Sequence, residues 1–166
     1  MAVEMKNETS QNTDLINELI SFLTKGNAHV TFNDAVKNIP FEDVSKKPGG
    51  LPYSLWQIVE HIRITQKDIL DFSANKNYKE LNWPGDYWQK NSAPANEEEW
   101  NNSIQKINSD LDEFIELLKN SDDIYKPFEH GSGQNLLREA ILIGDHNSHH
   151  TGEIILLRRL LGNWKR

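Results

Sequence analysis

Histidine is the residue type in this sequence whose number and spacing best suit chemistry. His146 and His150 are four residues apart in a segment with helical periodicity. Residues at that spacing project from one face of a helix, one turn apart, so both imidazoles can reach a single ion. The other four histidines are His29, His61, His130 and His149. The spacing makes a divalent metal ion the first candidate for a bound group.

The pair also has an ordinary explanation, because two polar side chains on a helix are compatible with a solvated face. Its position favours a metal: at about 100° per residue, the pair shares an arc with Ile143, Leu157 and Leu161 and borders a buried stripe. Burying two imidazoles without a partner is unfavourable, and a metal ion satisfies both lone pairs. His149 points roughly 60–100° away from the pair, so we expect it at the surface or in a supporting position beside the ligands.

A third histidine lies on another predicted helix. His61 has Ile58 one turn before it and Thr65 one turn after it, at the edge of the apolar face. It is either a histidine at the border of the core that bonds to a neighbour, or a ligand that faces the pair across an antiparallel bundle. Three histidines with an open coordination position are the usual catalytic arrangement for a divalent metal. His29 and His130 lie in loop-like or ambiguous segments, and we expect neither to be a ligand.

The composition restricts the other chemistries. The chain has 166 residues and no cysteine, which excludes disulfide scaffolds, iron–sulfur clusters and a cysteine nucleophile. Its net charge is −7, and a negatively charged protein is repelled by the phosphate groups of nucleic acids. Nucleic acid is therefore not an expected partner. The Glu-x-x-His pairs of di-iron bundles, the HExxH motif and the glycine-rich nucleotide motifs are absent from the sequence.

The length and the ends of the chain predict one domain over residues 1–166. Residues 1–12 are polar and are expected to form a flexible tail, without the apolar stretch of a signal peptide. No window approaches 18 consecutive apolar residues, so we expect no association with a membrane. The expected location is the cytoplasm.

Helical periodicity dominates the chain. The first predicted helix ends near Gly26, and the stretch 29–39 either continues it or forms a second short helix. The apolar stripe of the first predicted helix contains Leu15, Ile16, Leu19, Ile20, Phe22 and Leu23. Ser54 is a plausible N-cap for a long helix that runs to about residue 74.

Two further helices are predicted, one from near Ala95 through Leu118 and one over about 135–161. The last is apolar on more than half of its circumference, so it is central or shared with a partner. Residues 75–96 are expected to form a long ordered loop, because Trp83, Tyr87 and Trp88 are costly to leave in water. These aromatic side chains either pack in the core or form the wall of a pocket. Four main helices and one long crossover loop predict an all-α four-helix bundle.

Two segments resemble a known family. Residues 53–61 (YSLWQIVEH) and 145–154 (DHNSHHTGEI), followed by ILLRRLL, are similar to the DinB-like (DNA-damage-inducible, YfiT-type) family. The resemblance covers about residues 15–164. It depends on the histidine in the second long helix, on the HxxxH pattern and on the small residue Gly152 that follows it.

The resemblance implies a DinB/YfiT-like bundle with up-down-down-up topology, usually a homodimer. It implies a nickel or zinc site on His61, His146 and His150, and metal-dependent hydrolase or thiol S-transferase activity of the bacillithiol or mycothiol type. Two positions depart from the pattern: many members have Gln at Glu153 and an aromatic residue at His149. Glu153 shares the ligand arc and could tune the metal's water or orient His150.

The leading hypothesis is therefore a metal-dependent enzyme, a thiol (bacillithiol-type) S-transferase or a hydrolase, that acts on a small electrophile. Because the chain has no cysteine, the thiol would be an external low-molecular-weight co-substrate. The alternative is a non-catalytic metal- or ligand-binding stress-response protein, because a bundle of this size does not need a metal to fold. Ligand histidines must be neutral, so metal affinity should weaken as the pH falls through roughly 6.5. Leu160, Leu161 and Trp164 are expected to pack on a second copy.

Overall fold

The computed structural model describes residues 2–164, with side chains from residue 12 onward, and every element in that range is a helix. The prediction of an all-α fold is confirmed. Eight elements follow one another: α1 (Ala2–Thr24), α2 (Phe32–Val36), the 3-10 turns η1 (Phe41–Asp43) and η2 (Pro48–Gly50), α3 (Leu55–Ala74), the 3-10 turn η3 (Gly85–Tyr87), α4 (Glu97–Lys119) and α5 (Leu136–Leu160).

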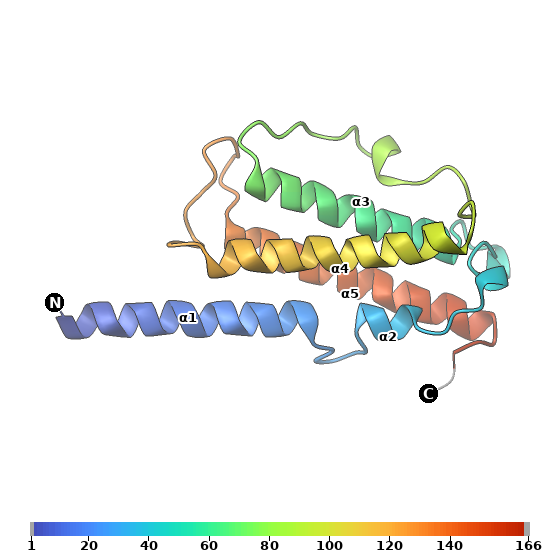
Figure 1. Ribbon diagram of the computed structural model, residues 1–166, viewed down its shortest axis with the longest axis horizontal. Coiled ribbons are helices and arrows are strands. Elements are labelled where there is room, and N and C mark those ends of the chain that lie inside the picture. Colours follow the sequence, from blue (N-terminus) through green and yellow to red (C-terminus); the bar gives the residue numbers. More distant parts are fainter. Residues whose placement is uncertain (1, 165–166) are drawn as a thin grey trace.

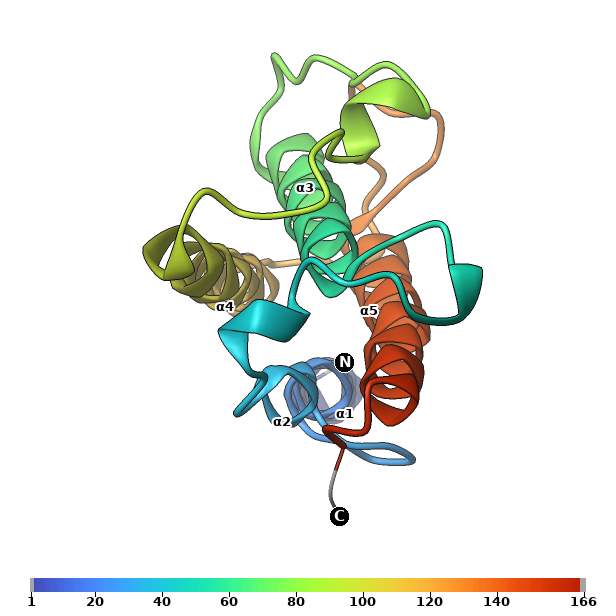
Figure 2. The same ribbon diagram turned by 90° about the vertical axis from the view of Figure 1, so that its right-hand side faces the viewer.

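The four long helices surround a common centre, with α2 beside α1 (Figure 2). In Figure 1, α1 and α5 run from left to right, whereas α3 and α4 run from right to left. Because α3 and α4 point the same way, the chain between them must return along the whole length of α3, and residues 75–96 make this crossover (Figure 1). The predicted loop is present with the predicted limits.

Polar caps define where the long helices begin. The side-chain oxygens of Ser54, Asn96 and Asn135 each accept a hydrogen bond from a backbone N–H in the first helical turn. Such caps satisfy amide groups that have no partner within the helix. Ser54 forms a full capping box with Gln57, which fixes the register of α3 and so the direction in which His61 points.

Two apolar clusters fill the bundle, one toward each end. The first includes Leu55, Trp56 and Ile154, and the second includes Leu70, Phe114 and Ile143. On α5 the two clusters therefore meet in the interval between Ile143 and Ile154, and His146 and His150 lie in that interval. The apolar cores fix the two helices on both sides of the histidines.

Two expectations about the first part of the chain need correction or refinement. Most of the segment 1–12, expected to be a flexible tail, is helical because α1 begins at Ala2; Met1 lies outside the described residues. Residues with fair helix propensity continue the helix upstream of the apolar stripe. The ambiguous stretch 29–39 contains a separate short helix, α2, which Thr31 caps.

Among residues 2–164, no helix is long and apolar enough to cross a membrane.

Candidate metal centre

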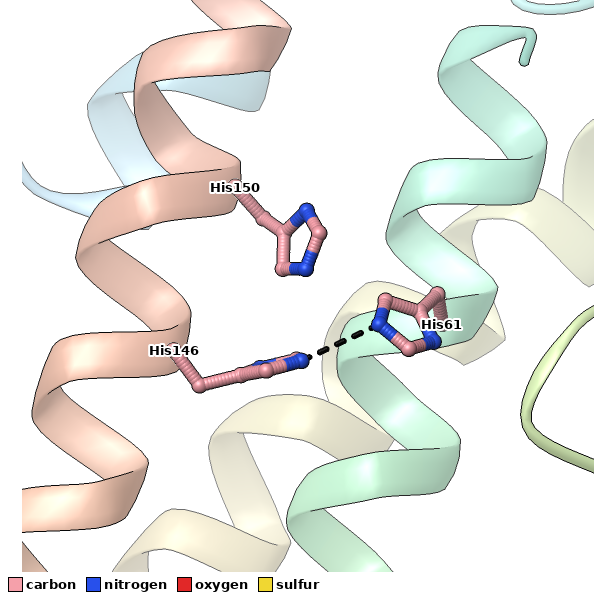
Figure 3. A group of neighbouring side chains, drawn as sticks. All are labelled: His61, His146 and His150. Atoms are coloured by element: carbon pink, nitrogen blue, oxygen red, sulfur yellow. Dashed lines mark hydrogen bonds between the residues drawn. The ribbon is translucent and has the colours of Figure 1, made fainter. Parts of the chain in front are cut away.

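Three histidine rings converge between α3 and α5. His61 comes from α3 and His146 and His150 come from α5, and Figure 3 shows all three side chains pointing into the space between the two helices. The ring centroids are 4.9 Å apart for His61 and His146, 4.7 Å for His61 and His150, and 4.4 Å for His146 and His150. The structure thus brings together the three residues that the sequence nominated as ligands.

The crossover loop sets the tautomer of His61. Its Nδ1 lies 2.8 Å from the backbone carbonyl oxygen of Tyr87. A carbonyl only accepts, so Nδ1 carries the proton and Nε2 of the neutral ring keeps a free lone pair. That Nε2 lies 3.1 Å from Nε2 of His146 (Figure 3). Burial lowers the pKa of His61, although the bond to Tyr87 and the charge of Glu153 oppose the shift.

Glu153 fixes the tautomer of His150, as the Tyr87 carbonyl fixes that of His61. Its Oε2 lies 2.6 Å from Nδ1 of His150, so Nδ1 donates and Nε2 is left as the possible ligand atom. Burial, followed by the neighbouring His61 and His149, lowers the pKa of His150 to about 4. The carboxylate of Glu153 favours the protonated ring and opposes this shift, but its side chain is 35% exposed, so solvent screens its effect.

His146 has the weakest hydrogen bond at Nδ1, a 3.5 Å contact with Oδ1 of Asn147. Burial lowers its pKa to about 4, and the rings of His150 and His61 add to the shift. The ring is therefore neutral at neutral pH and available as a ligand.

His149 is not part of this cluster. Its side chain is 68% exposed, and its Nε2 lies 3.7 Å from Oε1 of Glu153. His149, His150 and Glu153 form a second group with ligand atoms close together, but His150 and Glu153 are already hydrogen-bonded to each other. The expected surface position of His149 agrees with its exposure.

Aromatic rings cover one side of His61. The indole of Trp88 stacks on its imidazole with centroids 3.9 Å apart and planes 5° apart, and Tyr53 stacks on the outer face of Trp88 at 4.0 Å. The crossover loop reaches α3 through Tyr87 and Trp88, and it leaves the side chain of Trp83 74% exposed.

The crossover loop is fastened to α3 by residues that sequence reasoning missed. Asp68 accepts hydrogen bonds from the phenols of Tyr78 and Tyr87, each 2.7 Å long. Gln57 donates to the backbone carbonyl of Gln89 over 2.8 Å. These contacts fix the segment that carries the Tyr87 carbonyl. The available signal was that Asp68 follows His61 by seven residues and so shares its helix face.

The two histidines that were not expected to be metal ligands, His29 and His130, lie outside the three-histidine cluster. The Nε2 of His29 is 3.0 Å from Oγ of Ser148, and the Nε2 of His130 is 2.8 Å from the carbonyl oxygen of Phe72. Neither ring belongs to the three-histidine cluster.

The donor set fits a small divalent ion. Two imidazole nitrogens on one tetrahedral zinc ion, each at about 2.0–2.1 Å, are about 3.3 Å apart, and the Nε2 atoms of His61 and His146 are 3.1 Å apart. The ligand atoms of all three histidines lie within 4.8 Å of one another, so small adjustments of the rings would bring them around one centre. Neutral imidazoles with oriented lone pairs are suitable ligands for zinc and nickel.

Comparison with known protein families matches residues 5–165 to the DinB family. The match covers nearly the whole chain, so the chain belongs to this family. Comparisons with curated proteins and with solved structures returned no match.

Proposed function

We propose that this protein is a metal-dependent enzyme in which His61, His146 and His150 hold one divalent ion, zinc or nickel. The reaction is transfer of an external thiol of the bacillithiol type to a small electrophile, or hydrolysis of a small substrate. The observation that carries the proposal is the convergence of three neutral imidazoles, two of which have their Nδ1 protons engaged by Tyr87 and Glu153.

Each contributing residue has a distinct task. The carbonyl of Tyr87 and the carboxylate of Glu153 hold the Nδ1 protons, so the lone pairs of His61 and His150 face the shared space. Trp88 excludes water from one face of His61. Burial, with the neighbouring rings of His150 and His61, keeps His146 neutral. When bound, a divalent ion supplies a Lewis acid that lowers the pKa of water or of a thiol.

Three protein ligands leave room for a further molecule at a four-coordinate ion, which distinguishes a catalytic site from a closed structural one. Because the sequence contains no cysteine, thiol chemistry here requires a thiol from solution. This requirement makes the proposal specific: turnover should depend on both the metal and the added thiol in the transferase, and on the metal alone in the hydrolase.

The test combines metal analysis with turnover. Protein purified without added metal is analysed for zinc and nickel, stripped with a chelator and reloaded with each ion. Activity is then measured with bacillithiol and a small electrophile such as monochlorobimane, and separately with esters and amides. A rate above the uncatalysed reaction, lost on chelation and in His146→Ala, supports the proposal. Failure to bind any divalent ion would overturn it.

The alternative function, a non-catalytic metal- or ligand-binding protein, also has a supporting observation. The two apolar clusters account for the bundle without any contribution from the three histidines, so an ion is not needed to hold the fold together. Tight metal binding without any rate above background would favour this function.

Quaternary structure and location are further parts of the proposal. Ile141, Leu156 and Leu160 on α5 are 51%, 49% and 53% exposed, and their spacing places them on one face together with Gly152. An apolar stripe of this kind suits an isologous contact with the same helix of a second copy. We therefore propose a cytoplasmic homodimer with a small-molecule substrate.

A further inference from the structure

A cavity of about 170 Å³ lies between the C-terminal end of α1, α2, α4 and α5, and the three clustered histidines do not line it. One part of its wall is apolar, formed by Phe22, Leu23, Phe32, Ile107 and Leu111. An apolar cavity of about 150 Å³ is enough to bind benzene. The volume therefore suits a molecule with one ring and a few further atoms.

A second part of the cavity wall is polar, and its side chains are held by hydrogen bonds to each other. Asn33 and Asn108 form a reciprocal amide pair, in which each Nδ2 donates to the other's Oδ1 over 3.0 Å. Each carboxamide uses one donor and one acceptor in this pair, and so retains one N–H and one lone pair. The pair joins the α2 region to α4 and offers a ligand both a donor and an acceptor.

The neighbouring part of the polar wall comes from α5 and the loop before α2. The hydroxyl of Ser148 lies 3.0 Å from Nε2 of His29, and Nδ1 of His29 lies 2.7 Å from the carbonyl oxygen of Val30. Since that carbonyl only accepts, His29 donates from Nδ1 and accepts the Ser148 proton at Nε2. Both side chains line the cavity, and a lone pair of the Ser148 oxygen stays available as an acceptor.

The charged residues that line the cavity have no net formal charge. Lys25 and Asp112 both line it, so their formal charges cancel and neither sign of ligand charge is favoured by the lining as a whole. An amphipathic neutral ligand satisfies the apolar wall and the amide-rich wall at once.

We propose that this cavity is a binding site, separate from the three-histidine centre, for a small neutral molecule that has one apolar ring and one carboxamide-like group. The ring packs against Phe22, Phe32 and Leu111, and the polar group exchanges hydrogen bonds with the Asn33–Asn108 pair. The site does not depend on a bound metal, so it stands apart from the proposed enzyme activity.

Benzamide is the probe, because it has the required ring and a carboxamide. It is titrated into the whole protein, first stripped of metal and then loaded with zinc, while ¹H–¹⁵N spectra follow the side-chain amides. We expect saturable shifts at Asn33 and Asn108 with the same affinity in both preparations. Benzene, without the polar group, and benzoate, with a charge, should each bind at least fivefold more weakly. Shifts that rise linearly without saturation, or tighter binding of benzoate, would overturn the proposal.

Two pairs of variants separate a built site from surface adsorption. Ser148→Leu fills the cavity, and Ser109→Leu places the same side chain at an exposed position on α4. Asn108→Ala removes half of the amide pair, and Asn101→Ala is the matched exposed control on α4. We expect tenfold or greater loss of benzamide affinity in the first member of each pair and none in the second. If circular dichroism shows that Ser148→Leu does not fold, Asn108→Ala decides. Equal binding by Asn108→Ala and Asn101→Ala would contradict the assignment.

Discussion

The backbone carbonyl of Tyr87 accepts a hydrogen bond from Nδ1 of His61 over 2.8 Å. Tyr87 lies in the crossover loop and His61 in the middle of α3, so this one bond links the long connection to the histidine cluster. A backbone acceptor cannot be removed by a change of side chain, and it leaves Nε2 of His61 unprotonated. The crossover thereby prepares a neutral imidazole for the space that His146 and His150 share.

Removing any one of the three clustered histidines should abolish tight metal binding. His61→Ala, His146→Ala or His150→Ala is expected to lower zinc affinity by about 100-fold or more, because the loss of a residue that only orients a metal ligand already costs about 10–100-fold. The fold should persist, since the apolar clusters do not include these rings. Titration calorimetry measures the affinity. The control is His149→Ala, whose side chain is 68% exposed; an equal loss in this variant would disprove the assignment.

Glu153 should act through His150 rather than as a ligand. Glu153→Ala removes the acceptor 2.6 Å from Nδ1 of His150 and should reduce zinc affinity by about 10–100-fold. Glu153→Gln keeps an acceptor oxygen and should retain most of the affinity. Zinc titrations compare both with Glu113→Gln, an exposed control on α4. If Glu153→Gln and Glu153→Ala lost affinity equally, the charge rather than the orientation of His150 would be the controlling feature.

Asp68 should position the crossover loop. Burial and the hydrogen bonds to Asp68 raise the pKa of both Tyr78 and Tyr87. In Asp68→Ala the phenols lose this partner, so their pKa values should fall, and the Tyr87 carbonyl should hold His61 less firmly. We expect a loss of about 1–3 kcal/mol in the free energy of unfolding and about tenfold weaker zinc binding.

Ultraviolet titration of the tyrosines and zinc calorimetry test this prediction together. Asp122→Ala, an exposed position after α4, is the control. A fall in stability without any change in zinc affinity would mean that Asp68 fastens the loop but does not position His61.

The long helices and the position of the HxxxH pair on one helix face could be predicted because local signals determine them. Ser54 at the start of α3, the loop limits at residues 75 and 96, and the HxxxH pair all follow from capping, composition and helical spacing. The partners of the histidines could not be predicted in the same way. The Tyr87 carbonyl has no side-chain signature, and its position depends on how a long loop lies along α3.

The positions of some large apolar side chains could not be predicted from residue type alone. Trp83 was expected inside because indole is costly to expose, but a loop contacts its scaffold on one side only, and Trp83 lies on the other. Leu161 and Trp164 were expected at a dimer contact with Leu160. Leu161 and Trp164 are half-buried within the chain: Leu161 packs against the first apolar cluster, and the guanidinium of Arg158 lies 4.8 Å from the ring of Trp164, whereas Leu160 is exposed.

The pH dependence should extend to lower pH than the sequence suggests. The ordinary histidine pKa of 6.5 predicts that protons compete with metal below that pH, but burial lowers the pKa of His146 and His150 to about 4. Zinc occupancy should therefore persist at pH 5.5 and fall as the pH approaches 4. Metal analysis after equilibration at each pH measures this. Loss of half of the zinc near pH 6.5 would mean that these rings are protonated as readily as exposed ones.

The same shifts should affect the stability of the metal-free protein. Between pH 6.5 and about 4 the unfolded chain takes up protons on His146 and His150, whereas the folded chain does not. The free energy of unfolding should therefore be fully retained above pH 6.5 and fall as the pH is lowered through that window. Urea unfolding of His146→Gln should show a flatter pH dependence than the wild type. His149→Gln is the control, and a profile identical in all three proteins would contradict the shifts.

The exposed stripe of α5 should control the oligomeric state. Leu156 and Leu160 are 49% and 53% exposed, and a carboxylate at either position would be buried and repelled by its symmetry mate in an isologous contact. Leu156→Glu and Leu160→Glu should shift light scattering from the mass of a dimer to that of a monomer and weaken association at least tenfold. Tyr125→Glu, at a 51% exposed position in the loop that precedes α5 and outside the stripe of α5, is the matched control. A wild-type protein that is monomeric at all concentrations would rule out the dimer, and a dimer that survives both α5 substitutions would place its interface elsewhere.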